Sequence, residues 1–132
     1  MLRVKVQKLE KITIVKLLGQ IVSDEKNVLR KAVISQGDVN VVVLDFACVT
    51  VVDARGLGLM LELREWLLSK GIELSLIHVT RLVRQVFEIT CLNTLFKFSS
   101  EAEILAKVSS LQPDAVDASG SRKVEAFLGS LC

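Results

Sequence analysis

The sequence predicts an α/β fold with a central, mostly parallel sheet, and three observations lead to that prediction. An apolar, largely β-branched run from Val41 to Val52 is bounded at both ends, as expected for a strand buried on both faces. The turn Asp53–Gly58 follows at once, and the segment after it, up to Lys70, is rich in helix-forming Leu, Met and Glu. Strand-like and helix-like segments then alternate, as in βαβ units. We expect about five strands and about four helices.

The first 40 residues predict a hairpin and one helix. Apolar and polar side chains alternate over residues 2–7, and a second strand pattern over residues 12–18 is closed by Gly19, so the two segments predict an antiparallel hairpin. Ser23 is a predicted N-cap, and the helix that it starts should end before Gly37. The apolar residues at helical spacing are Val28, Leu29, Ala32 and Val33.

After the central strand and helix, the second half of the chain predicts two more strands and two more helices. Residues 72–79 alternate as a strand, and residues 95–98 form a short edge strand. Thr80 caps a helix whose predicted inward face is Val83, Val86, Phe87 and either Thr90 or Cys91. Ser99–Glu101 opens the last helix, with Ile104, Leu105, Val108 and Leu111 inward.

Composition excludes several classes of function. The 132 residues suffice for one packed core, since 51% of them are hydrophobic. Basic and acidic residues number 17 and 15 and are interspersed, and aromatic residues are few, so nucleic-acid binding has little support. The N-terminus lacks a signal-peptide pattern, and no run has the length of a membrane span. Three cysteines, Cys48, Cys91 and Cys132, include no CxxC pair. We expect a reduced, cytoplasmic protein without membrane insertion, in which Cys48 and Cys91 are small buried residues and Cys132 a terminal thiol.

The turn after the central strand carries the most specific motif. Asp53 is the predicted N-cap of the following helix, and the glycines allow a tight turn and close packing on the sheet. Leu44-Asp45-Phe46 together with Val52 to Gly58 resembles the central signature of the STAS domain, the sulphate transporter and anti-sigma-factor antagonist module.

The resemblance implies a STAS-like fold and a partner. In the family's single-domain bacterial members the motif reads Asp-Ser-Ser/Thr-Gly-Leu-Gly, and a partner anti-sigma factor kinase phosphorylates the serine after the aspartate. The corresponding residue is Ala54, which has no hydroxyl to phosphorylate. The likeness runs from about Leu2 to Leu111 and includes a third-helix pattern over residues 78–92. Two departures stand out: Gln20 lies where an acidic residue is usual, and Cys91 where a glycine is frequent.

The sequence offers no catalytic residues, metal site or cofactor site. The only histidine, His78, has apolar neighbours and is better explained as structural, and strand and N-cap positions account for Asp45 and Asp53. The cysteines are too scattered to predict a metal site. The glycines of the turn match neither phosphate-binding loop motif, so nucleotide binding there is the weakest alternative.

The central helix predicts a protein-binding surface. At about 100° per residue, Leu57, Leu61, Leu68, Met60 and Leu67 should face the sheet, and Glu62, Glu65 and Ser69 form a polar strip. Leu59, Leu63 and Trp66 are left over, which predicts an exposed apolar patch for association. Arg55 either pairs with Asp53 or reaches an acidic group of a partner. The predicted partner-binding residues are Asp53, Ala54, Arg55, Gly56, Leu59, Leu63 and Trp66.

The chain divides into a STAS-like domain, residues 1–111, and a linker with a short amphipathic helix, residues 112–132. Val124, Phe127, Leu128 and Leu131 form one apolar stripe, which packs on its own domain or docks on a partner or second copy. The function predicted is a non-enzymatic binding module resembling an anti-sigma factor antagonist, with an anti-sigma factor kinase-like protein as partner. The alternative is a homodimer or an assembly subunit, for example of a membrane-transport complex.

Overall fold

The computed structural model describes residues 2–9, 11–21, 26–34, 39–111 and 126–129. Its elements follow one another in the predicted order. They are β1 (Arg3–Lys8), β2 (Ile12–Ile21), α1 (Lys26–Ile34), β3 (Val41–Val52), α2 (Ala54–Ser69), β4 (Glu73–Ile77), α3 (Arg81–Ile89), β5 (Lys97–Ser99) and α4 (Glu101–Leu111). The predicted cap at Ser23 and the predicted stop before Gly37 lie outside the described residues.

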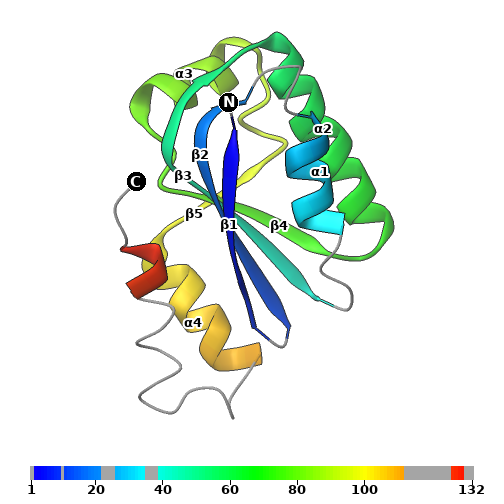
Figure 1. The fold of residues 1–132 in the computed structure, drawn as a ribbon, viewed down its shortest axis with the longest axis vertical. Coiled ribbons are helices and arrows are strands. Elements are labelled where there is room, and N and C mark those ends of the chain that lie inside the picture. Colours follow the sequence, from blue (N-terminus) through cyan, green and yellow to red (C-terminus); the bar gives the residue numbers. More distant parts are fainter. Residues whose placement is uncertain (1, 10, 22–25, 35–38, 112–125, 130–132) are drawn as a thin grey trace.

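The five strands form one sheet in the order β1-β2-β3-β4-β5 (Figure 1). β1 pairs with β2 antiparallel, and every other pairing is parallel. The central position of β3 follows from its sequence, because ten of its twelve side chains are apolar and it is covered on both faces. The predicted α/β fold with an antiparallel N-terminal hairpin is confirmed.

The helices cover the sheet unequally (Figure 1). A large hydrophobic cluster joins one face of the sheet to α1, α2 and α3, and it includes Phe46, Met60 and Phe87. Phe87 lies edge-on to three other aromatic rings, with centroids 5.3 to 6.4 Å away. A smaller cluster joins the opposite face to α4, through side chains such as Ile104 and Val108.

β3 carries two β-bulges towards its carboxyl end. Between the pairs Lys16↔Asp45 and Leu18↔Cys48, β2 advances two residues while β3 advances three, and a second extra residue, Thr50, follows. The first bulge is supported by Asp45, whose Oδ1 accepts a hydrogen bond from the Ala47 backbone N–H at 2.9 Å. β3 continues beyond the end of β4, which pairs with it only as far as Asp45.

α2 and α3 both end in a left-handed residue that closes the last turn. Gly71 has φ 71°, and the amide of Ile72 donates back to the Leu67 carbonyl at 2.9 Å. Cys91 has φ 61° in the same arrangement, with the amide of Leu92 donating to the Phe87 carbonyl at 2.8 Å. These are Schellman motifs, which usually use glycine because L side chains are strained in this conformation.

The early end of α3 corrects part of its predicted inward face. Val83 and Phe87 are buried and Val86 is half-buried, as predicted, but Thr90 and Cys91 are exposed. Helical spacing no longer applies to them, because the helix ends at Ile89 and the chain turns there.

The cysteines also differ from expectation. Cys48 is buried, as predicted, but it is disulfide-bonded. Cys91 is an exposed free thiol rather than a small buried residue. The exposure follows from its place in the turn after α3.

The described part of the C-terminal segment packs on the domain. Residues 126–128 form a helical turn, in which Leu128 is 3% exposed and belongs to the smaller hydrophobic cluster with Ile12 and Ile14. Phe127 is partly buried against the same cluster. Val124 and Leu131 of the predicted stripe lie outside the described residues. None of the helices described combines the length and the apolar character needed to cross a bilayer.

Candidate functional site

The turn from β3 into α2 is held by hydrogen bonds of Asp53. Its Oδ1 accepts from the Gly56 backbone N–H at 2.8 Å, and its own carbonyl accepts from the Leu57 N–H at 2.9 Å. Its extended backbone, with φ −97° and ψ −179°, is that of an N-cap. Asp53 therefore has the predicted capping role, and its negative charge lies at the positive end of the helix dipole.

Gly56 brings α2 against the end of β2. A Cβ atom at this position would overlap the Ile21 carbonyl oxygen, so only glycine fits without a shift of the backbone. Gly58 is different, because a Cβ there would meet nothing within 4 Å. Gly56 is buried and positions the turn, and it is not accessible for contact with a partner.

The surface at this end of the sheet is small and exposed. We call Thr50, Val51, Asp53, Ala54 and Arg55 the α2 platform, since all five are exposed and contiguous around the helix start. The Thr50 hydroxyl donates to the Gly19 carbonyl at 3.2 Å, which ties the platform to β2. Ala54, the first residue of α2, presents a methyl group where a hydroxyl would be needed for phosphorylation.

The predicted apolar patch on α2 is wrong for two of its three residues. Leu59 is 5% exposed and Leu63 is 3% exposed, both within the large cluster, and Trp66 is partly buried against it. The physical reason is that α2 is covered by α1 as well as by the sheet (Figure 1). Leu68, predicted to face inward, is instead 56% exposed. The polar strip is as predicted, with Glu62, Glu65 and Ser69 exposed.

The position of Gly56 could have given the correct orientation of α2. A glycine that allows close approach must face its neighbour, and Met60, Leu63 and Leu67 follow it at helical spacing on the same side. Leucine lies on nearly every face of this helix, so the apolar pattern alone was ambiguous.

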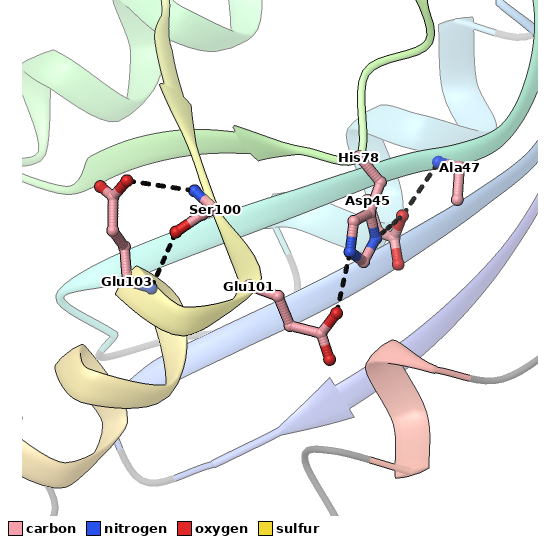
Figure 2. Close-up of polar contacts among 6 residues, drawn as sticks. All are labelled: Asp45, Ala47, His78, Ser100, Glu101 and Glu103. Carbon is pink, nitrogen blue, oxygen red and sulfur yellow. Dashed lines mark hydrogen bonds and ion pairs between the residues drawn. The ribbon is translucent and has the colours of Figure 1, made fainter.

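Asp45 and Asp53 are far apart and cannot act as a catalytic pair. Asp45 lies within β3 and Asp53 directly follows it, and with two bulged residues between them the separation along the strand is roughly 20 Å. Asp45 instead contacts His78, which in turn contacts Glu101 (Figure 2). The sequence predicted a structural histidine with apolar neighbours, and the two carboxylates were not foreseen. Among the residues that the structure describes, no group of His, Cys, Asp and Glu is arranged to hold a metal ion.

Comparison with known proteins decides the family. A family model described as the STAS domain matches residues 3–104. The chain belongs to the STAS domain family. No curated protein sequence matches it.

Solved structures share the STAS fold. The unphosphorylated anti-sigma factor antagonist SpoIIAA superposes with a TM-score of 0.67 at 20% identity, over 82% of this chain and 97% of SpoIIAA. A putative anti-sigma factor antagonist from Thermotoga maritima gives a TM-score of 0.69 at 18% identity, covering 80% and 93% of the two chains. A sulfate transporter family protein from Wolinella succinogenes gives 0.62 at 21% identity, covering 76% and 86%. At these identities the likeness is one of fold.

Proposed function

We propose that this STAS domain is a non-catalytic protein-binding module that acts as an anti-sigma factor antagonist in a partner-switching system. The observation that carries the proposal is Ala54, exposed at the start of α2 on a turn fixed by Asp53 and Gly56. SpoIIAA, which has this fold, has been solved in unphosphorylated and phosphorylated forms. The partner proposed is an anti-sigma factor kinase-like protein.

The α2 platform suits recognition rather than reaction. Its backbone is fixed on three sides, by the Asp53 cap, the Gly56 contact and the hydrogen bond of Thr50 to Gly19. The platform carries one cation, Arg55, and one carboxylate, Asp53, at the positive end of the α2 dipole, and the proposed partner surface has an acidic group that meets Arg55.

The contact surface proposed differs from the predicted leucine patch. Because Leu59 and Leu63 are buried, contact along α2 would use the exposed residues Ala54, Arg55, Gly58 and Glu62. At about 100° per residue, these four positions lie on one side of the helix. Trp66 and the two leucines would act indirectly, by holding α2 in place.

The absence of a hydroxyl at position 54 has a regulatory consequence. Phosphate on the turn would put about two negative charges beside Asp53 and so repel an acidic partner surface. Ala54 cannot carry that phosphate. The complex would therefore stay bound when ATP is present, or respond to something other than phosphate at this position.

A phosphorylation assay tests the proposal. The kinase-like partner recovered from the native host is mixed with the wild-type domain or the Ala54→Ser variant and labelled ATP. We expect no label on residues 53–58 of the wild type and a stable complex, whereas Ala54→Ser takes up label and dissociates. Peptide mass spectrometry locates the label.

Two results would contradict the proposal. One is phosphate-dependent release of the wild-type domain from the partner when ATP is added. The other is an Ala54→Ser variant that carries phosphate and still binds as tightly as the wild type. A Thr50→Ala variant serves as control, because label lost on that substitution would place the modified hydroxyl on β3.

Assembly remains the second candidate, and one observation favours it. Leu82 and Ile89 lie seven residues apart on α3 and are 73% and 82% exposed, which is typical of an association surface. Such a surface would serve a homodimer or a subunit of a membrane-transport complex. Light scattering separates the candidates, because a monomer supports switching and a tight dimer supports assembly.

A further inference from the structure

Three ionisable side chains from distant parts of the chain form a row beneath α4 (Figure 2). Asp45 lies on β3 and is fully buried, His78 directly follows β4, and Glu101 is the first residue of α4. His78 Nδ1 lies 3.1 Å from Asp45 Oδ1, and Nε2 lies 3.1 Å from Glu101 Oε2. The imidazole thus connects the centre of the sheet to the start of α4.

The inner part of this row is fixed. His78 has φ 55°, a left-handed conformation that is uncommon outside glycine and that the surrounding structure must enforce. Asp45 Oδ1 also accepts the Ala47 N–H at the first bulge of β3, so this carboxylate is held from two sides. The Glu101 side chain is 40% exposed, so it is the member that can move away.

Counting protons shows what the geometry requires. A carboxylate only accepts hydrogen bonds, and a neutral imidazole has a single N–H. When both carboxyl groups are ionised and both ring nitrogens lie at hydrogen-bond distance from their oxygens, the two contacts need two N–H donors. The imidazolium form has both. If the ring loses one proton, a nitrogen lone pair faces a carboxylate and one contact becomes repulsive.

We propose that Asp45, His78 and Glu101 form a proton-dependent latch that fastens the start of α4 to the sheet. With two protons on the ring, both contacts hold. With one proton, the N–H stays with Asp45, because water cannot replace a lost donor at this buried carboxylate, whereas it can at half-exposed Glu101, so the contact to Glu101 opens.

Other charged side chains lie around the latch, and they bear on which carboxylate can separate from His78. Lys16, fully buried on β2, is the register partner of Asp45 and lies on the same face of the sheet. Arg81 is exposed at the start of α3, and Glu103 on α4 is engaged with Ser100. Asp45 is buried, and Glu103 is already engaged with Ser100. Glu101 is therefore the carboxylate that can move away from the imidazole.

Opening would loosen the first turn of α4 and leave its far end in place. The Ser100 hydroxyl accepts from the Glu103 N–H at 3.1 Å, and the Ser100 N–H donates to Glu103 Oε1 at 3.3 Å, which together form a capping box (Figure 2). The far end of α4 is held separately, by the contact of Lys107 with Glu73. With the Glu101 contact open, the first turn of α4 would be held only by the capping box and by the packing of Ile104 on the sheet, so its amides would open more often.

The sign of the pH dependence follows from the proton count. The closed state holds one proton more than the open state, so the latch is complete at low pH. The contact to Glu101 is lost as the pH rises and the ring gives up that proton.

Hydrogen exchange on the intact chain tests the latch. Amide exchange of α4 is measured between pH 5.5 and 8 and corrected for intrinsic rates, in the wild type and in Glu101→Gln. We expect opening of α4 in the wild type to increase about tenfold over this range, the size expected for one charge-assisted hydrogen bond. In Glu101→Gln the pH dependence should disappear. If Glu101 acted only as a negative charge at the start of the helix, Glu101→Gln would lower the protection of α4 by the same factor at every pH.

The control and a second readout make the outcome decisive. Glu88→Gln removes an exposed carboxylate paired with Arg84 on α3 and should leave the pH dependence of α4 unchanged. Because His78 is the only histidine, its ring nitrogens give unambiguous ¹⁵N signals, and both should be protonated at pH 5.5. Equal pH dependence in the wild type and Glu101→Gln, or one bare ring nitrogen at pH 5.5, overturns the latch.

Discussion

At the scale of single residues, the two glycines of the central turn have different tasks. Gly56 lies against the Ile21 carbonyl, whereas Gly58 faces open space. Both lie in a helix, where glycine costs about 1 kcal/mol relative to alanine. The domain accepts that cost at Gly56 because the backbone of α2 must come close to β2.

The pair gives a matched prediction. Gly56→Ala should lower the free energy of unfolding by about 1–3 kcal/mol, because the added methyl group forces α2 away from the sheet. Gly58→Ala should raise it by up to about 1 kcal/mol, because nothing opposes the methyl group there. Urea unfolding of the two variants measures both changes. Equal effects of the two substitutions would contradict the close-packing role of Gly56.

Cys91 shows how a resemblance and a structure inform each other. The sequence shows a cysteine where the family often has glycine, without a reason. The structure supplies the reason, since the position needs a left-handed backbone to close α3. Asp53 and Thr80 are the opposite case, because their N-cap roles follow from the sequence alone and are confirmed.

At the scale of elements, β3 and the start of α2 were predictable almost to the residue. A β-branched run, an acidic cap and a glycine turn all indicate the same boundary. The orientation of α2 was not predictable, because leucines occur around most of the helix. The side of α2 that was predicted to face inward differs from the buried side by a rotation about the helix axis. This rotation is somewhat less than the roughly 100° between successive residues. Leu59 and Leu63 were therefore placed outside, although α1 and the sheet cover them.

One carboxylate, that of Glu73 on β4, contacts lysines of both β5 and α4. Glu73 accepts hydrogen bonds from Lys107 and from Lys97, the latter at 2.8 Å, and both lower the pKa of Glu73 below its ordinary value of 4.5. The same contact with Glu73 raises the pKa of Lys97. A carboxyl group whose pKa is lower in the folded state stabilises the fold above its unfolded pKa, and this contribution is lost as the pH falls through the folded value.

Glu73→Gln should therefore cost stability at neutral pH and little at acid pH. We expect a loss of up to about 1 kcal/mol at pH 7, since the group is partly exposed and screened by solvent. The difference from the wild type should vanish as the pH falls below about 4.5, the ordinary value of the group. Thermal unfolding across this range measures it, with Glu88→Gln as the exposed control. A difference that persists in acid would show that the charge is not responsible.

At the scale of the whole molecule, the two faces of the sheet are covered by different means. Helices α1, α2 and α3 cover one face, and α4 shares the other with the turn at residues 126–128. Residues 3–104 match the STAS family model, and this turn lies beyond the matched range. The predicted boundary at residue 111 remains a prediction.

Leu128 gives the test of this covering. Leu128→Ala should lower the free energy of unfolding by about 2 kcal/mol or more, because the side chain is buried against Ile12 and Ile14. Limited proteolysis should also cut the C-terminal segment faster. Substitution of exposed Leu82 by alanine is the control and should change stability by less than about 0.5 kcal/mol. A neutral Leu128→Ala would mean that the turn contributes nothing to the fold.

The sequence could not predict that His78 contacts two carboxylates. Asp45 is 33 residues before His78, and Glu101 is 23 residues after it. Alternation along a strand indicates which face a side chain lies on, but not which distant side chain will meet it. The sequence supported a structural histidine and could not name its partners.

The two bulges of β3 constrain how this chain can change length. Each adds one residue opposite β2, so core-facing positions of β3 run 42, 44, 46, 49 and 52 instead of following strict alternation. Deletion of Thr50 alone would turn Val52 outward and rotate α2 with it. Loss or gain of a single codon in this stretch would thus disturb the α2 platform.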